Sequence, residues 1–397
     1  MRTFPAIVLT GPRQSGKTTL LKKLFARTHT FLSLEDPDIR VLARDDPRGF
    51  LEQYKAPLIL DEIQYVPDLL SYIKSAIDEH RKPGQWIISG SQNFLLMKGV
   101  TQSLAGRAAV FTLLPFSYAE QAGRGSAMKA PTQWMRELSM DTTKKTTRVE
   151  SRKIDEWILR GNYPEIASNK KVDRKIWCAS YIATYLERDV RNLTAVGDLN
   201  QFDRFLTLCA TRTGQLLNYS DIARDIGISV PTAKRWISLL EASYQVYLLY
   251  PYYKNIGKRL VKAPKLYFTD TALASYLLGI HNRETLLGSP HFGNLFETAI
   301  INEFVKRFTH FGEKPPLYFL RTFTKDEVDI ALEFATKLSL FEIKSSATIA
   351  PKHAEILKRF IATIPRSSLS RAYLISRSPY RAILSPNIAL KHWTDIT

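Results

Sequence analysis

Cysteine is scarce in this sequence of 397 residues, which contains only Cys178 and Cys209. The two lie far apart and form no CxxC pair, which excludes a disulfide framework and a cysteine-based zinc site. Both occur in apolar stretches with helical periodicity, so we expect two buried thiols.

Long hydrophobic runs are also missing, because no apolar stretch reaches the ~18 residues that a membrane-spanning helix requires. The chain enters its first apolar strand soon after Met1, which leaves no space for a signal peptide. We therefore expect a cytoplasmic protein with no membrane partner. Hydrophobic residues at 45% and charged residues at 24% exclude wholesale disorder.

Acidic residues are in deficit: 38 Asp and Glu face 56 Lys and Arg, and the formal net charge is +18. An excess of this size is typical of proteins that bind polyanions such as nucleic acid or anionic lipid surfaces. Lysines scattered over the surface give the same total without any partner. Charge alone therefore leaves DNA binding open.

Residues 1–121 predict a parallel α/β domain, because short, continuously apolar strands alternate with amphipathic helices. The predicted strands are Ala6–Thr10, Phe31–Leu34, Pro57–Leu60, Trp86–Ser89 and Ala109–Leu113. The predicted helices are Lys17–Arg27, Asp38–Leu51, Pro67–Glu79 and Leu95–Ala105. Residues 122–153 are polar with little periodicity, and we interpret them as a mobile linker or a long insertion.

The rest of the chain is first helical and then returns to mixed α/β. Helical periodicity covers Ile154–Leu159, Val172–Leu193 and Leu199–Ala210, and a helix–turn–helix pattern follows at Tyr219–Leu240. The last third predicts a helix at Gly293–Phe308 and strands at Leu317–Arg321, Val328–Phe334 and Leu338–Lys344.

The clearest motif is Gly-Pro-Arg-Gln-Ser-Gly-Lys-Thr at residues 11–18, which matches GxxxxGK[ST] between a predicted strand and a predicted helix. In such a phosphate-binding loop (P-loop), backbone N–H groups and the positive end of the helix enclose phosphates. Lys17 is expected to pair with β- and γ-phosphate oxygens, and the Thr18 hydroxyl to coordinate magnesium. We therefore expect ATP and Mg2+ as cofactors, held by Gly11, Pro12, Arg13, Gln14, Ser15, Gly16, Lys17, Thr18 and Thr19.

Two acids follow the third predicted strand. Asp61 is expected near the magnesium ion held by Thr18, and Glu62 is expected to orient and deprotonate the attacking water. Ser91, after the fourth strand, is expected to sense the γ-phosphate, with loop capping as the alternative. Arg107, before the fifth strand, is expected to reach the γ-phosphate of a neighbouring subunit, with pairing to a surface acid as the alternative.

A set of short motifs extends along the chain. They are Gly-Pro-Arg-Gln-Ser-Gly-Lys-Thr-Thr-Leu-Leu at 11–21, Leu-Asp-Glu-Ile-Gln at 60–64, Leu-Ala-Gly-Arg at 104–107, Arg-Gly-Asn-Tyr-Pro-Glu at 160–165 and Lys-Leu-Tyr-Phe-Thr-Asp at 265–270. Together they resemble the prokaryotic AAA-type ATPases whose C-terminal half is a domain of unknown function. The likeness covers nearly the whole chain, the polar linker excepted.

The resemblance implies an α/β fold class with a defined order of parts. These are an AAA-like P-loop ATPase core at 1–121, the linker or insertion at 122–153, a helical segment at 154–212, a winged helix–turn–helix at 213–285 and a restriction-endonuclease-like α/β domain at 286–397. A homo-oligomer or a partner protein stays open. Members of this group carry a further segment before the first strand that is expected to hold adenine, which leaves base selectivity open here.

Basic residues accompany the helix–turn–helix spacing of Asp221–Ser229. Lys234 and Arg235 project from the second helix, and Lys258 and Arg259 fall where a wing would lie. We expect these four cations to contact DNA phosphates or guanine edges. The same arrangement also serves as a protein-contact module, so that alternative stays open.

Asp329 and Glu342-Ile343-Lys344 lie on neighbouring predicted strands, and alternation puts Glu342 and Lys344 on one face. Asp329 and Glu342 are expected to bind magnesium, Lys344 to position or activate water, and Glu297 to supply an outer carboxylate. The pattern resembles the D…ExK site of restriction-like nucleases. A nuclease fold kept only for assembly or DNA binding is the alternative.

The sequence thus predicts Mg2+-dependent hydrolysis of ATP to ADP and phosphate, coupled to a DNA-associated role of the C-terminal half. Two other classes stay open. One is a nucleotide-dependent binding switch, for DNA or a protein partner, with little turnover. The other is a metal-dependent nuclease.

Overall fold

The computed structural model describes residues 3–91, 100, 103–140, 151–186, 199–253, 262–334 and 336–397. The chain divides into two compact units. The first comprises Met1–Pro115 with Ala242–Tyr244, and the second comprises Phe116–Glu241 with Gln245–Thr397.

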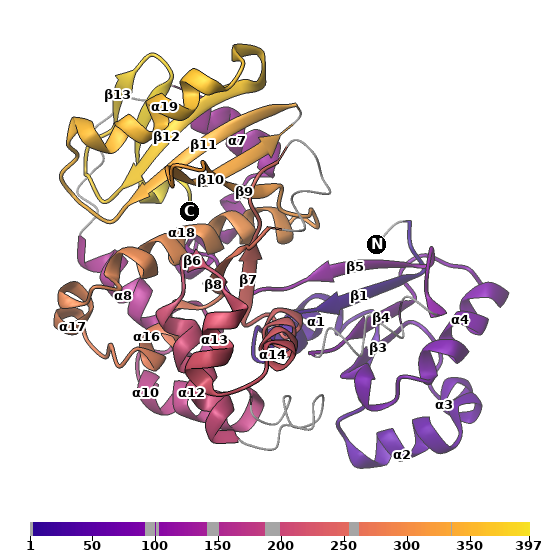
Figure 1. Cartoon of the computed structure of the whole chain (residues 1–397). Helices are drawn as coiled ribbons and strands as arrows, with labels where there is room; N and C mark the ends of the chain where they lie inside the picture. The colour runs from indigo at the N-terminus through magenta and orange to yellow at the C-terminus, as the bar shows by residue number, and fades with distance from the viewer. Residues whose placement is uncertain are drawn as a thin grey trace. The chain divides into compact units, whose positions relative to one another are not determined.

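The first unit is built on a five-stranded sheet, in the order β2-β3-β4-β1-β5, whose paired strands all run parallel (indigo to purple in Figure 1). The strands are β1 (Ala6–Thr10), β2 (Thr30–Ser33), β3 (Leu58–Asp61), β4 (Trp86–Ser89) and β5 (Ala108–Thr112). The central strands β1, β3 and β4 are buried along their whole length, which explains their continuous apolar runs. All five predicted strands are confirmed, each displaced by at most about one residue.

The helices of this unit are α1 (Lys17–Phe25), α2 (Pro37–Asp45), α3 (Pro47–Gln53) and α4 (Leu69–Glu79). The prediction of one helix over Asp38–Leu51 is wrong. Pro47 lacks the N–H that a continuing helix needs, and the Asp46 side chain accepts a hydrogen bond from the Gly49 N–H at 2.9 Å, which caps the new helix α3. Most of the helix predicted at Leu95–Ala105 lies outside the described residues.

The second unit begins with short helices. They are α6 (Tyr118–Gln121), α7 (Pro131–Ser139), α8 (Ser151–Arg160), α9 (Pro164–Ser168), α10 (Arg174–Tyr181), the π-helical turn Ile182–Leu186 and α12 (Leu199–Thr211). Helix α7 corrects the expectation of little regular structure in residues 122–153, since Trp134, Met135 and Leu138 are buried along one side of it. The linker boundaries themselves stay a prediction.

A compact module follows, made of β6 (Gln215–Leu216), α13 (Tyr219–Ile226), α14 (Val230–Ala242), β7 (Val246–Leu249) and β8 (Lys265–Phe268). The three strands form an antiparallel sheet in the order β6-β8-β7. Trp236 of α14 is buried edge-on against Phe202 and Phe205 of α12. The predicted helix–turn–helix is confirmed as a pair of helices, and the Ser229 Oγ accepts a hydrogen bond from the Thr232 N–H at the start of α14.

The last part of the chain forms a six-stranded mixed sheet in the order β13-β14-β12-β11-β10-β9. The strands are β9 (Leu317–Arg321), β10 (Glu327–Phe334), β11 (Lys337–Lys344), β12 (Leu369–Ser376), β13 (Ala382–Ser385) and β14 (Ile388–His392). The helices are α16 (Thr271–Leu277), α17 (Arg283–Gly288), α18 (Phe292–Thr309) and α19 (Glu355–Thr363). The helix and the three strands predicted here are confirmed.

Helices α18 and α19 cover opposite faces of this sheet (Figure 1). Leu340 of β11 belongs to the apolar cluster that includes Leu357 and Phe360 of α19. The next residue, Phe341, has its ring centroid 4.8 Å from that of Phe304 in α18. Because successive strand side chains point to opposite faces, the sheet is buried on both sides.

Both cysteines are buried, as predicted. Burial raises the pKa of the Cys178 thiol to about 12 and that of Cys209 further still. Among the described residues, no helix combines the length and the apolar character needed to cross a lipid bilayer.

Candidate nucleotide-binding site

The candidate site lies at the carboxyl ends of β1, β4 and β3, which are neighbours in the sheet. The P-loop connects β1 to α1 and turns at Gly11 (φ 144°) and Gly16 (φ 95°), both in conformations that favour glycine. A Cβ at Gly11 would lie only 2.1 Å from the Leu113 carbonyl oxygen. The motif therefore has glycine at 11 because the backbone just after β5 passes directly beside the loop.

Lys17 is held inside this loop. Its side chain is buried, and its Nζ donates to the carbonyl oxygens of Gly11 at 3.0 Å and Pro12 at 2.8 Å. Burial lowers the pKa of Lys17 to about 8, although the carboxylates of Glu62 and Asp61 act in the opposite direction. A buried ammonium group that is hydrogen-bonded to neutral carbonyls is well suited to receive a phosphate oxygen.

Ser15 supplies a second polar group in the loop. Its Oγ is buried and, within the part of the chain that the structure describes, has no hydrogen-bond partner. A buried hydroxyl of this kind costs free energy unless a ligand or water satisfies it. These polar groups of the loop are therefore compatible with the phosphate binding that the sequence predicts.

Asp61, at the end of β3, faces the first residues of α1. Its Oδ2 accepts a hydrogen bond from the Thr18 Oγ1 at 2.6 Å, and its Oδ1 accepts one from the Ser89 Oγ at the end of β4. A carboxylate beside two hydroxyl oxygens is the kind of oxygen ligand set that Mg2+ prefers. The structure therefore brings Thr18 and Asp61 together as predicted.

Glu62 follows in a left-handed backbone conformation, with φ 58° and ψ 45°. Non-glycine residues adopt this conformation at a cost of about 1 kcal/mol or more, and such residues gather at functional sites. The Glu62 Oε2 accepts hydrogen bonds from the Ser91 Oγ at 3.1 Å and from the Gln64 amide. Ser91 thus lies at the predicted site, where its partner is the carboxylate of the predicted base.

Arg107 has a different partner from the one predicted for it. Its Nε and Nη2 pair with the Asp78 carboxylate at 2.6 and 2.9 Å, and its Nη1 donates to the Ala105 carbonyl at 3.2 Å. The hydrogen bond with Asp78 raises the pKa of Arg107 and lowers that of Asp78. This is the pairing with a surface acid that the sequence left as the alternative, and contact with a neighbouring subunit stays a prediction.

Two residues of this site were missed from the sequence, Ser89 and Gln64. Ser89 is the last residue of the apolar strand β4, and the sequence gives it no distinguishing signal. Gln64 returns to Glu62 only because the left-handed turn is followed by the 3-10 helix Ile63–Tyr65. The position of Gln64 two residues after the acid gives no signal by itself.

The basic residues of the helix–turn–helix lie partly outside the described residues. Lys234 and Arg235 are exposed on α14, as predicted. The Lys234 Nζ lies 5.7 Å from the centroid of the Tyr219 ring. Lys258 and Arg259 fall in the segment 254–261, which the structure does not describe.

The nuclease-like residues converge in the second unit, but around a lysine that the sequence did not indicate. Lys265 of β8 is buried, and its Nζ lies 2.5 Å from Glu327, 3.2 Å from Glu297 and 3.8 Å from Asp329. Glu342 pairs with Lys344 at 2.6 Å. Burial alone would lower the pKa of Lys265, but these carboxylates more than offset it, and the net shift is upward.

Burial raises the pKa of Glu297 to about 7 and that of Glu342 to about 8, and in both cases the Asp329 carboxylate adds to the shift. Among the described residues, no three Asp, Glu, His or Cys side chains are arranged to hold a metal ion. The Lys265 ammonium group lies among Glu297, Glu327 and Asp329, whereas Glu342 pairs with Lys344. The magnesium site expected at Asp329 and Glu342 stays a prediction.

Comparison with known families agrees with the geometry of the first unit. Residues 3–122 match the AAA domain, residues 151–284 match a domain of unknown function (DUF8612), and residues 292–387 match a second one (DUF4143). The P-loop and the acids that face it thus belong to an AAA-type P-loop domain.

Two relatives fix the family. Uncharacterized protein Rv2008c of Mycobacterium tuberculosis and uncharacterized protein Mb2031c of Mycobacterium bovis are each 30% identical to this chain over 346 residues, which is 87% of this chain and 71% of theirs. The chain belongs to the same family as these two mycobacterial proteins.

Solved structures give only a distant likeness. The RuvB Holliday junction branch migration motor of Thermotoga maritima shows 16% identity and a TM-score of 0.30, with 61% of this chain and 81% of that chain covered. Protein VC1899 of Vibrio cholerae shows 12% identity and a TM-score of 0.18, with 99% and 95% covered. At these scores the likeness carries no argument about function.

Proposed function

We propose that this protein is an ATP hydrolase that cleaves ATP to ADP and phosphate with Mg2+. The observation that carries the proposal is the meeting of Lys17, Thr18, Asp61 and Glu62 at the carboxyl ends of β1 and β3, which lie on either side of β4 in the parallel sheet. The AAA-domain match over residues 3–122 supports it.

Each residue has a distinct part in this proposal. Lys17 and the loop N–H groups bind the β- and γ-phosphates, and Thr18 and Asp61 hold the metal ion, which neutralises phosphate charge when bound. Glu62 accepts the proton of the attacking water. Ser91 and Gln64 fix the orientation of the Glu62 carboxylate, which a general base requires.

The test is phosphate release by purified protein. Glu62→Gln keeps the side-chain shape but removes the base, so we expect kcat to fall by ~100-fold or more while ATP binding persists. Lys17→Ala is expected to abolish binding and turnover together. Glu52→Gln, an exposed acid on α3, makes the same chemical change away from the site and serves as the control.

Equal, slow phosphate release by the native protein and Glu62→Gln, together with tight ATP binding, would contradict hydrolysis as the function. That outcome would favour the binding switch, in which ATP binding at the loop controls binding of DNA or a protein partner with little turnover. Absence of ATP binding in the native protein would remove both proposals.

We also propose that the C-terminal half contacts DNA. The element order α12-β6-α13-α14-β7-β8, with its three-stranded antiparallel sheet, is that expected of a winged helix–turn–helix, and α14 presents Lys234 and Arg235 to solvent. The net charge of +18 supports the same proposal. Lys258 and Arg259 are included in it as the cations of the wing.

A metal-dependent nuclease has less support. The element order α18-β9-β10-β11-α19-β12 is compatible with the restriction-endonuclease-like domain that the sequence predicts. Lys265, however, already balances Glu297, Glu327 and Asp329. The simpler proposal is a nuclease-like fold kept for assembly or DNA binding.

A further inference from the structure

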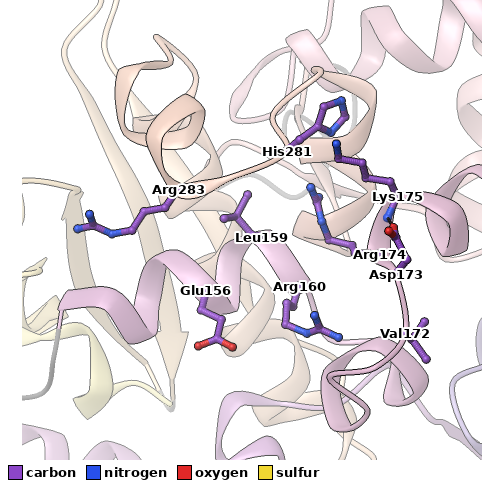
Figure 2. Close-up of a pocket in the computed structure, with 9 residues that line it drawn as sticks. All are labelled: Glu156, Leu159, Arg160, Val172, Asp173, Arg174, Lys175, His281 and Arg283. Atoms are coloured by element: carbon purple, nitrogen blue, oxygen red, sulfur yellow. Dashed lines mark hydrogen bonds between the residues drawn. The ribbon is translucent and has the colours of Figure 1, made fainter.

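A basic pocket of about 560 Å³ lies in the second unit, far along the sequence from the P-loop. It is formed by α8, by the first residues of α10 with the turn before them, and by the segment 281–283 (Figure 2). Its lining comprises Glu156, Leu159, Arg160, Val172, Asp173, Arg174, Lys175, His281 and Arg283. All of these lie within the range that matches DUF8612.

Arg174 is the central residue of this pocket. Its exposed fraction is only 8%, and its Nη2 donates to the Ile280 carbonyl at 3.0 Å. Its Nη1 is buried and has no hydrogen-bond partner among the residues that the structure describes. Burial lowers the pKa of Arg174, which reflects the cost of keeping the guanidinium away from water. A buried cation with an unsatisfied N–H is costly unless a ligand completes its hydrogen bonds.

Further cations surround Arg174. Lys175 lies beside it together with His281 (Figure 2), and Arg160 binds the carbonyl oxygens of Ile166 and Asn169. Across the described residues, no carboxylate lies within 4.0 Å of the side-chain nitrogens of these three cations, Arg160, Arg174 and Lys175.

The acids that line the pocket are engaged elsewhere. The Asp173 Oδ1 caps α10 by accepting hydrogen bonds from the N–H groups of Lys175 at 2.7 Å and Ile176 at 3.2 Å. Glu156 lies 3.6 Å from the Lys170 Nζ. Arg283 extends to one side, where its Nε donates to the buried Asp155 at 2.9 Å. The pocket therefore keeps an excess of positive charge.

We propose that this pocket binds a small ligand through a phosphate group, with Arg174 as its anchor and Lys175 and Arg160 as further contacts. A guanidinium fork matches phosphate oxygens in pairs, and the volume is in the range of small-molecule sites. Because Arg174 is recessed, a compact ligand such as a nucleoside phosphate reaches it, whereas the backbone of a duplex does not.

The experiment uses full-length protein carrying Lys17→Ala, which removes phosphate binding by the P-loop. Isothermal titration with pyrophosphate is expected to give one binding event. Lys175→Glu reverses one charge at an exposed position and is expected to weaken binding at least tenfold. Lys337→Glu makes the same change in net charge on β11, outside the pocket, and is expected to leave binding unchanged.

Arg174→Gln gives a second readout, with thermal unfolding as its check on folding. It replaces the guanidinium by a shorter, uncharged amide, so we expect loss of pyrophosphate binding in a folded protein. Absence of pyrophosphate binding, or equal weakening by Lys175→Glu and Lys337→Glu, would overturn the proposal.

Two further titrations identify the chemistry of the ligand. Citrate carries comparable charge on carboxylates, and binding as tight as that of pyrophosphate would show that phosphate is not what the pocket selects. If a 5′-phosphorylated oligonucleotide bound more tightly than pyrophosphate, and Lys175→Glu weakened that binding, the ligand of the pocket would be a nucleic acid and the proposal of a small ligand would be wrong.

Discussion

At the scale of single residues, Gly11 combines an unusual backbone angle with a close neighbour. Its φ is 144°, and an added Cβ would lie 2.1 Å from the Leu113 carbonyl oxygen. Gly11→Ala is therefore expected to displace the loop from β5 and to weaken ATP binding at least tenfold, measured by titration. Gly123 also has a positive φ, of 71°, but no atom lies within 4 Å of the added Cβ. Gly123→Ala should cost only about 1 kcal/mol and leave ATP binding intact.

Lys265 allows a second test at this scale. Lys265→Met leaves the buried Asp329 and the partly buried Glu297 and Glu327 without their cation, so we expect the free energy of unfolding of the second unit to fall by about 3 kcal/mol. Adding Glu297→Gln to Lys265→Met should restore part of this loss, measured by denaturant unfolding. Equal stability of the native protein and Lys265→Met would show that the cluster does not depend on the lysine.

Residue roles were predictable from the sequence where a motif fixes both the spacing and the partner. Lys17, Thr18 and Asp61 meet because the P-loop follows β1 and Asp61 ends β3, two parallel strands with only β4 between them. Lys265 was not predictable, because it lies on β8 whereas Glu297 is on helix α18 and Asp329 is on β10 of another sheet, and nothing in the local sequence indicates such a contact. The role of Ser89 was not predictable either, because its hydrogen bond to Asp61 joins two strands that are distant in the sequence.

At the scale of elements, α14 carries the DNA proposal. Replacing both Lys234 and Arg235 by Ala is expected to weaken DNA binding. Because two phosphate contacts are lost, the slope of the logarithm of the binding constant against the logarithm of the salt concentration should become shallower by about 2. Fluorescence anisotropy at several salt concentrations measures both quantities. Lys337→Ala with Lys352→Ala removes two exposed cations elsewhere. If the two double substitutions weakened DNA binding equally, the net charge of the protein would determine the affinity, and α14 would have no specific part in it.

The elements themselves were largely visible in the pattern of apolar residues. The five strands of the first sheet and the strands β9, β10 and β11 of the six-stranded sheet were predictable, because buried strands give continuous or alternating apolar runs. The strands β12, β13 and β14 were not predicted. Helices α2 and α3 were joined in the prediction although Pro47 marks their boundary. Helix α7 was missed because its polar residues outnumber the four apolar side chains that it buries, which are Pro131, Trp134, Met135 and Leu138.

At the scale of the whole molecule, the division into two compact units predicts two unfolding transitions. Mg2+ with ATP at 100 times its Kd should stabilise the transition of the first unit by about 2.7 kcal/mol. Differential scanning calorimetry measures the shift, and Lys17→Ala should remove it. A single transition in the native protein, shifted as a whole, would contradict independent unfolding of the two units.

Acid is expected to destabilise the second unit through His392. This side chain is buried, and its Nδ1 accepts a hydrogen bond from the Thr394 N–H. Burial lowers the pKa of His392 to about 4, and Arg381 adds to the shift. Below pH ~6.5 the unfolded chain binds a proton that the folded chain does not, so stability falls as the pH drops towards 4.

The measurement is urea unfolding at about pH 7 and about pH 5. His392→Gln is expected to lose about 1–2 kcal/mol less between the two pH values than the native protein. The exposed His80→Gln is the matched control. An identical pH dependence for the native protein and His392→Gln would assign acid sensitivity to other groups.

Helix α18 limits how the chain can be divided for experiments. Apart from its first turn, nearly every side chain of it is buried, and it contacts α8, α16 and β8 as well as β11. The DUF4143 match begins at this helix, whereas three of its packing partners belong to the DUF8612 match. A fragment that starts at residue 292 would expose the apolar surface by which α18 contacts α8, α16 and β8, so it should aggregate when expressed alone. The two matched segments therefore form one folding unit, to be cloned and purified together.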